Sequence, residues 1–123
     1  MNVHTALGPG LIESVYQRCF CAELKAHQIP FRSQVPVPVR YRDVTLDGGY
    51  RLDVMVDDWL VVEIKAVDAI LPIHKAQVLT YLKLTGAPQG LILNFNTVHL
   101  RDGIRSVTLQ GPSENKEQSA TSA

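Results

Sequence analysis

Two apolar stretches of the sequence each contain charged residues that need a chemical reason. Asp53 stands among leucine, valine and methionine, and Glu63 and Lys65 are two positions apart among valine, isoleucine and alanine. Such β-branched, apolar stretches are typical of strands, and residues two apart in a strand project from the same face. We therefore expect Glu63 and Lys65 to share one face of a strand.

The two predicted strands, Tyr50–Val56 and Trp59–Val67, are joined by two consecutive aspartates, which is typical of a short hairpin connection. In that hairpin, residues whose numbers sum to about 115 or 116 face each other. Asp53 and Glu63 are then direct cross-strand neighbours. Like charges in that position destabilise a sheet unless something neutralises them.

A divalent cation would neutralise this pair, since Mg²⁺ is held by one or two carboxylates and keeps several waters. Lys65 could then orient a water and stabilise negative charge that develops on a phosphate, which is the chemistry of phosphodiester hydrolysis. The residues alone leave another interpretation open, in which these charges form the exposed face of an edge strand. Asp53 would then make a plain ion pair with Arg51 or Lys65.

A longer set of motifs resembles one known family. The set comprises Gly10-x-x-Glu13-x-x-Tyr16, Leu52-Asp53, Glu63-x-Lys65 and the segment from Pro72-Ile73-His74 to Gly86. It resembles the GxxExxY protein family of the PD-(D/E)XK nuclease superfamily, with similarity running to Ile104. The resemblance implies an α/β (α+β-like) fold with a restriction-endonuclease-like core, a mixed β-sheet flanked by helices, and Mg²⁺ as cofactor. In the family the N-terminal helix is longer, so the first helix is expected to be truncated.

The resemblance also implies roles for individual residues. Asp53, Glu63 and Glu13 match the metal-binding acids, and the backbone carbonyl of Ile64 adds a further ligand. Lys65 matches the catalytic lysine, which acts together with Asp53 and Glu63. From the residues alone, Glu13 is equally a first-turn acid that the helix dipole favours.

Gln77 and Tyr81 match the Gln-x-x-x-Tyr motif of nucleases similar to the RecB nuclease domain, which implies a catalytic role for Gln77 and a substrate contact for Tyr81. They are four apart and share a helix face, as Glu13 and Tyr16 do at three apart. Tyr16 is therefore also expected to contact substrate, and so is His74, three residues before Gln77. The simpler alternative for the Gln-x-x-x-Tyr pair is a polar surface residue beside a half-buried aromatic.

The first half of the chain predicts one helix followed by strands. An amphipathic helix is expected over residues 10–28, after Gly8-Pro9-Gly10. Its apolar face would contain Leu11, Ile12, Val15, Cys19, Ala22 and Ala26. Alternation over Phe31–Tyr41 predicts a strand, which two prolines assign to a sheet edge. A second short strand is expected over Asp43–Asp47, before a turn at Gly48-Gly49.

The second half predicts another helix and more strands. The helix follows Leu71-Pro72 and ends before Gly86. Its buried face would contain Ile73, Ala76, Leu79 and Leu82 or Lys83. A buried strand is expected over Gly90–Phe95 and a further short hairpin over Val98–Leu109. This order of elements predicts one mixed sheet.

Composition restricts the class of protein. Hydrophobic residues are 46% and charged residues 20%, which predicts one globular domain over residues 1–110 and, because residues 111–123 lack large apolar side chains, a disordered tail. Twelve basic and twelve acidic residues balance, so any nucleic-acid binding needs a local patch. Cys19 and Cys21 would point to different faces of the helix as free thiols. The apolar runs are too short to cross a bilayer, so a cytoplasmic location is expected.

These observations predict a Mg²⁺-dependent nuclease, with Mn²⁺ as an alternative cation, that hydrolyses phosphodiester bonds by metal-activated water. DNA is the expected substrate in preference to RNA. The alternative is a non-cleaving module that keeps the nuclease fold and binds nucleic acid or a protein partner. Because one small domain offers little surface to grip a duplex, a homodimer or a protein partner is also expected.

Overall fold

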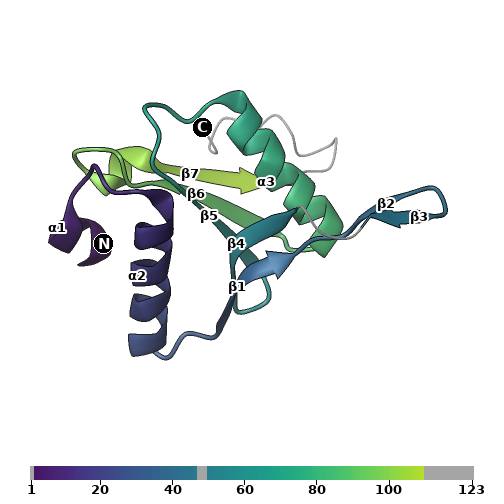
Figure 1. Cartoon of the computed structure of the whole chain (residues 1–123), viewed down its shortest axis with the longest axis horizontal. Coiled ribbons are helices and arrows are strands. Elements are labelled where there is room, and N and C mark those ends of the chain that lie inside the picture. The colour runs from purple at the N-terminus through teal and green to yellow at the C-terminus, as the bar shows by residue number, and fades with distance from the viewer. Residues whose placement is uncertain (1, 47–49, 110–123) are drawn as a thin grey trace.

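The computed structural model describes residues 2–46 and 50–109. At their centre is a five-stranded sheet with the order β1-β4-β5-β6-β7 (Figure 1). The strands are β1 (Phe31–Pro36), β4 (Arg51–Val56), β5 (Leu60–Lys65), β6 (Gln89–Asn94) and β7 (Ile104–Thr108). Strands β5 and β6 are parallel and the other neighbours are antiparallel. The predicted mixed sheet flanked by helices is confirmed, and it is consistent with a restriction-endonuclease-like fold.

Two helices cover the opposite faces of this sheet. Val62 and Ile64 of β5 belong to the core that α2 (Glu13–Ala26) covers, whereas Val61 belongs to the core under α3 (Pro72–Thr85). Because alternate residues of a strand point to opposite faces, β5 is covered on both sides. This explains why consecutive residues of β5, Leu60 to Val62, are all apolar, and why Glu63 needs another reason.

The hairpin between β4 and β5 has the predicted register. Val54 pairs with Val62 and Val56 with Leu60, so facing numbers sum to 116. Asp57 and Asp58 of the turn have φ angles of 49° and 57°. Positive φ at both central residues is the geometry of a type I′ turn, which aspartate tolerates better than most residues.

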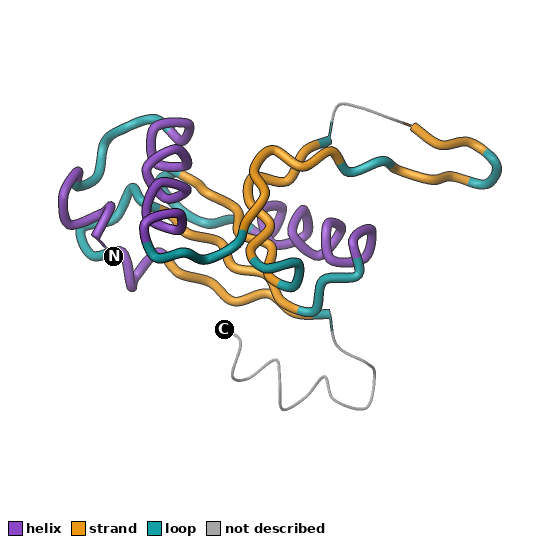
Figure 2. The backbone as a smooth tube through the Cα atoms, turned by 90° about the horizontal axis from the view of Figure 1, so that it is seen from below, coloured by secondary structure: helices purple, strands orange, loops and turns teal. Residues whose placement is uncertain are grey.

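A small two-stranded arm leaves the main sheet after β1. It consists of β2 (Val39–Tyr41) and β3 (Val44–Leu46), which pair only with each other. The arm projects away from the rest of the molecule (Figure 2). The predicted strand Phe31–Tyr41 is thus two strands, interrupted at Val37-Pro38, because proline has no N–H for a ladder. The edge position of β1 and the short strand within Asp43–Asp47 are confirmed.

The predicted face of the first long helix is wrong. Helix α2 begins at Glu13, so Leu11 and Ile12 precede it, and Ile12 is 67% exposed. The buried residues are instead Tyr16 and Leu24, four residues on either side of the packed Phe20. Of the predicted face, Cys19 does pack against this core. A short helix, α1 (Asn2–Leu7), packs beside α2 and was not predicted.

The second long helix has the predicted bounds, and its predicted buried face is right at Leu82 but wrong at Ile73. Ile73 is 68% exposed, whereas Val78, Tyr81 and Leu82 are buried against the sheet. Apolar residues occur on all sides of α3, so spacing alone could not select the face. The hairpin predicted over Val98–Leu109 is also wrong. That segment forms a 3₁₀ turn (Leu100–Gly103) and then β7, which pairs with β6.

Some predictions concern residues outside the described ranges, namely the turn at Gly48-Gly49 and the tail 111–123. In the described part, Cys19 and Cys21 are free thiols, as expected. None of the helices described over residues 2–46 and 50–109 has the length and apolar character needed to span a membrane.

A candidate active site at the end of strand β5

Two carboxylates replace the backbone pairing of β4 and β5 at one end of the hairpin. Val54↔Val62 is the last pair of the ladder in that direction. One residue further, the N–H of Asp53 donates to Glu63 Oε1 at 2.9 Å, and the N–H of Ile64 donates to Asp53 Oδ2 at 2.8 Å. Each carboxylate is therefore held by the backbone of the opposite strand. The sequence prediction that these acids are neighbours agrees with this geometry.

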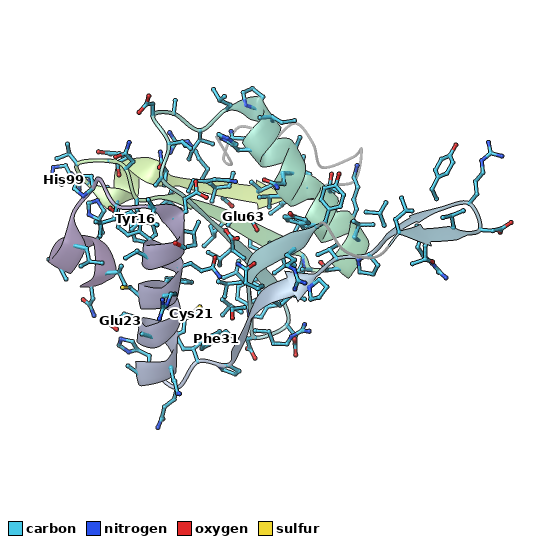
Figure 3. The ribbon with its side chains drawn as sticks, viewed as in Figure 1. Tyr16, Cys21, Glu23, Phe31, Glu63 and His99 are labelled. Atoms are coloured by element: carbon cyan, nitrogen blue, oxygen red, sulfur yellow. The ribbon has the colours of Figure 1, made fainter. Side chains whose placement is uncertain are left out.

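These acids do not lie on an exposed edge. Strand β5 lies between β4 and β6, and Glu63 is only 3% exposed. Figure 3 shows Glu63 within the sheet, between α2 and α3. The salt bridges in the described part of the chain join Glu23 to His27 and Arg32 to Asp58 rather than involving Asp53. The alternative of a solvated edge strand with a plain ion pair is therefore wrong.

Burial and mutual repulsion raise the pKa of both acids. Loss of hydration is the largest cause for Glu63, the negative charge of Asp53 adds to it, and the pKa of Glu63 rises to about 8. Burial also raises the pKa of Asp53, against the lowering effects of the Ile64 N–H and the Lys65 charge. The two side chains share a hydrogen bond. The pair therefore retains a proton near neutral pH unless a cation replaces it.

A chain of hydrogen bonds positions Lys65 beside these acids. Its Nζ donates to Gln77 Oε1 at 3.3 Å, and Gln77 Nε2 donates to the Tyr81 hydroxyl at 3.2 Å. That hydroxyl donates to the carbonyl oxygen of Arg51, also at 3.2 Å. Burial raises the pKa of Tyr81, with the charge of Glu63 contributing, so the hydroxyl keeps its proton. The Gln-x-x-x-Tyr pair on α3 thus links the lysine to strand β4.

Glu13 reaches the site from the first turn of α2 but remains at its margin. Its Oε2 accepts a hydrogen bond from the N–H of Ala66 at 3.1 Å, and its side chain is exposed. Its negative charge still contributes to the raised pKa of Asp53. Over residues 2–46 and 50–109, however, no group of three or more His, Cys, Asp or Glu residues gathers closely enough to hold a metal. The structure does not bring Glu13 close enough to act as the third ligand that was expected.

Two expected substrate contacts have different surroundings. His74 Nδ1 accepts a hydrogen bond from the N–H of Leu71 at 2.9 Å at the start of α3. A neutral ring therefore carries its proton on Nε2, which keeps a donor for another group. Tyr16 is 0% exposed, its ring stacks on Phe95 with centroids 4.6 Å apart, and its hydroxyl donates to Gly8 and accepts from Leu11. Tyr16 therefore fixes the loop before α2 instead of contacting substrate.

The structure adds two residues that the sequence argument did not select. Asn94, at the end of β6, is 2% exposed. Its Oδ1 accepts from the N–H of Val67 at 3.0 Å, and its Nδ2 donates to the carbonyl oxygen of Val67 at 2.9 Å. These bonds fix the chain just after Lys65. The sequence signal for this role was a polar residue at the end of a strand expected to be buried. Cys21 of α2 lies near Asp53, and burial together with that charge raises its thiol pKa. Nothing in the sequence indicated this proximity.

The donor set suits a hard divalent cation held by two carboxylates. One oxygen of each acid, Glu63 Oε1 and Asp53 Oδ2, is occupied by a backbone N–H. The remaining oxygens belong to two acids that repel each other unless protonated. Mg²⁺ is commonly bound through one or two carboxylates with waters completing the shell, so two protein carboxylates are sufficient. The residues present therefore fit such an ion better than one that needs a complete cage of side chains.

Comparisons with known proteins give a family and a similar fold. The sequence pattern of the PD-(D/E)XK nuclease superfamily matches residues 1–107. A solved structure titled "Crystal structure of SSO0001" superposes with a TM-score of 0.59 at 19% sequence identity. The superposition covers 88% of this chain and 55% of the other, so this chain spans about half the length of that protein. No curated protein sequence matches the chain.

Proposed function

The chain belongs to the PD-(D/E)XK nuclease superfamily, and from this premise we propose that it is a Mg²⁺-dependent nuclease of the GxxExxY type that hydrolyses phosphodiester bonds of DNA. The observation that carries the proposal is the pair of half-buried Asp53 and buried Glu63, with Lys65 beside it at the end of β5. A structural role alone gives no reason to bury two acids that repel each other. Perturbed acids of this kind are typical of functional sites.

In this proposal Asp53 and Glu63 hold the divalent cation, with the carbonyl of Ile64 as a further donor. The bound ion would supply Lewis acidity toward a phosphate oxygen and toward water. The two backbone hydrogen bonds, Asp53 N–H to Glu63 and Ile64 N–H to Asp53, orient both carboxylates before any substrate arrives. Such preorganisation lowers the cost of reaching the reactive geometry.

Lys65 supplies the positive charge for the phosphate. Gln77 holds its ammonium group through Oε1, and Tyr81 in turn holds Gln77. The ammonium then stabilises negative charge on the non-bridging oxygens as the phosphate is attacked. Gln77 is accordingly a positioning residue in this scheme.

Cleavage assays with single charge-removing variants test this proposal. Wild type is incubated with single-stranded DNA, duplex DNA and RNA in Mg²⁺, in Mn²⁺ and in EDTA. We expect cation-dependent cleavage that falls by about 100-fold or more in Asp53→Asn, Glu63→Gln and Lys65→Met, the scale seen when one electrostatic group is removed from an active site. Asp68→Asn and Lys83→Met, which change exposed side chains, are the matched controls and should cleave normally.

Two outcomes would overturn the proposal. One is the absence of cleavage on every substrate with either cation while the protein is folded. The other is cleavage that persists unchanged in Asp53→Asn, which would assign the activity to a contaminant. Nucleic-acid binding that survives loss of both acids, without cleavage, would instead support the non-cleaving module.

A further inference from the structure

A groove runs between α3 and the β2–β3 arm, next to the candidate site. Its volume is about 580 Å³, within the roughly 300–1,000 Å³ range of sites that take small ligands. The lining residues are Val39, Leu46, Tyr50, Ile73, His74, Ala76, Gln77, Thr80, Tyr81 and Leu84. Helix α3 contributes seven of these residues, and the arm contributes Val39 and Leu46.

The lining is mainly apolar, and among residues 2–46 and 50–109 it includes no lysine, arginine, aspartate or glutamate. Ile73 is 68% exposed and Tyr50 57% exposed, so large apolar surfaces face solvent here. Its polar side chains include those of Thr80, His74 and Gln77. Flat apolar walls with a few hydrogen-bonding groups suit a nucleobase, which has an aromatic face and a polar edge.

The groove is continuous with the candidate site through two shared residues. Gln77 and Tyr81 line it and also form the hydrogen-bond chain that holds Lys65. A nucleotide whose phosphate lies at Lys65 therefore has this groove next to it for a neighbouring base. The described residues that line the groove include no lysine or arginine for a phosphate backbone.

We propose that the substrate is single-stranded DNA, and that a base next to the cleaved phosphate enters the groove and stacks on Tyr50 and Ile73. This rests on the proposed nuclease function and deepens it. In a duplex the bases are stacked inside and only phosphates could face the groove, whose lining in the described part of the chain includes no lysine or arginine to receive them. The chain also carries no net charge, so it has no overall positive field to hold a duplex.

Substrates and variants can be combined to test the groove. The rate of Mg²⁺-dependent cleavage is measured on a single strand, on its duplex, and on single strands with one abasic nucleotide at each successive position. We expect the single strand to be cleaved about tenfold faster than the duplex or more. An abasic nucleotide at one position beside the cleaved bond should raise KM by about 5- to 100-fold, the range expected when one stacked base is lost.

Variants of the groove should act through the same base. Tyr50→Ala should raise KM on the intact strand but add little on the strand that is abasic at the sensitive position. Ile73→Glu places a negative charge in the groove and should weaken binding, whereas Val98→Glu is the matched control because Val98 is 79% exposed and does not line the groove. If cleavage is normal but insensitive to groove variants and to abasic positions, the inference fails and the nuclease function stands.

Binding provides an independent measurement that does not need catalysis. Fluorescence anisotropy of a labelled single strand is measured with wild type, Ile73→Glu and Val98→Glu. If no substrate is cleaved, the nuclease proposal fails, and unchanged binding in Ile73→Glu would overturn the groove assignment as well. Sedimentation velocity of the same proteins addresses a different occupant. A dimer that Ile73→Glu converts to monomers would assign the groove to a second copy of the chain and overturn the inference.

Discussion

Glu63 is the residue at which a proton and a divalent cation compete in this account. Its ordinary pKa of 4.5 rises to about 8 in the folded chain. The folded state therefore keeps a proton that the unfolded chain releases above its ordinary pKa. Its contribution to stability is complete below pH 4.5 and is lost as the pH rises through about 8.

The cation-free protein should therefore become less stable between pH 5 and pH 9, and Glu63→Gln should reduce that loss. Glutamine does not titrate, and its amide can still accept from the Asp53 N–H. Urea unfolding at several pH values in EDTA measures the difference between wild type and variant. Asp68→Asn is the control, and identical pH profiles for wild type and Glu63→Gln would contradict the burial of a titrating acid.

Tyr16 tests whether residues in the family-like motif serve structure or chemistry. Its hydroxyl hydrogen-bonds to the carbonyl oxygen of Gly8 and to the N–H of Leu11, and its ring stacks on Phe95 inside the core. Tyr16→Phe should lower the free energy of unfolding by about 1–3 kcal/mol, because it removes the two hydrogen bonds between the hydroxyl and the backbone of Gly8 and Leu11. KM for DNA should not change. A raised KM at unchanged stability would restore the substrate contact that the sequence suggested.

At the scale of elements, close packing of α3 on β6 determines where Gln77 lies. A Cβ on Gly90 would lie 2.5 Å from Val78 Cγ1, so only glycine allows the observed approach. Gly90→Ala should therefore destabilise the protein by about 1–3 kcal/mol. Chemical unfolding of Gly90→Ala, Val78→Ala and the double variant measures the energetic coupling between the two positions.

Removing the clash should make the double variant less destabilised than the sum of the single variants, by roughly 0.5–3 kcal/mol. Gly86→Ala is the matched control. An alanine at position 86 would be strained by the φ of 80°, but its Cβ would meet no atom within 4 Å. Its effect should simply add to that of Val78→Ala. If the effects of Gly90→Ala and Val78→Ala were also additive, the close approach of α3 to β6 would be contradicted.

The sequence predicted the elements that carry the chemistry better than the way they pack. The β4–β5 register followed from alternation and turn chemistry, both local properties, and it placed Asp53 beside Glu63 correctly. Which face of a helix is buried depends on what lies opposite, so the faces predicted for α2 and α3 were right only in part, for instance at Cys19 and Leu82. The binding of Glu13 to the Ala66 N–H likewise joins residues far apart in the chain. No local pattern encodes such a contact.

For the whole molecule, the superfamily match explains the fold but leaves the chemistry to be measured. The match covers residues 1–107, and the similar solved structure shares 19% identity. Similarity at that level supports the architecture alone. With no net charge on the chain, any affinity for nucleic acid must come from local surfaces, such as the proposed site and groove, rather than from an overall field.

Titration calorimetry with Mg²⁺ and Mn²⁺ tests the central claim, that Asp53 and Glu63 hold a divalent cation. We predict binding by wild type at pH 7, accompanied by proton release that differs in heat between buffers, because the cation displaces the proton held at Glu63. The double variant Asp53→Asn, Glu63→Gln should show neither. An absence of binding in folded wild type, or equal binding in the double variant, would contradict the account.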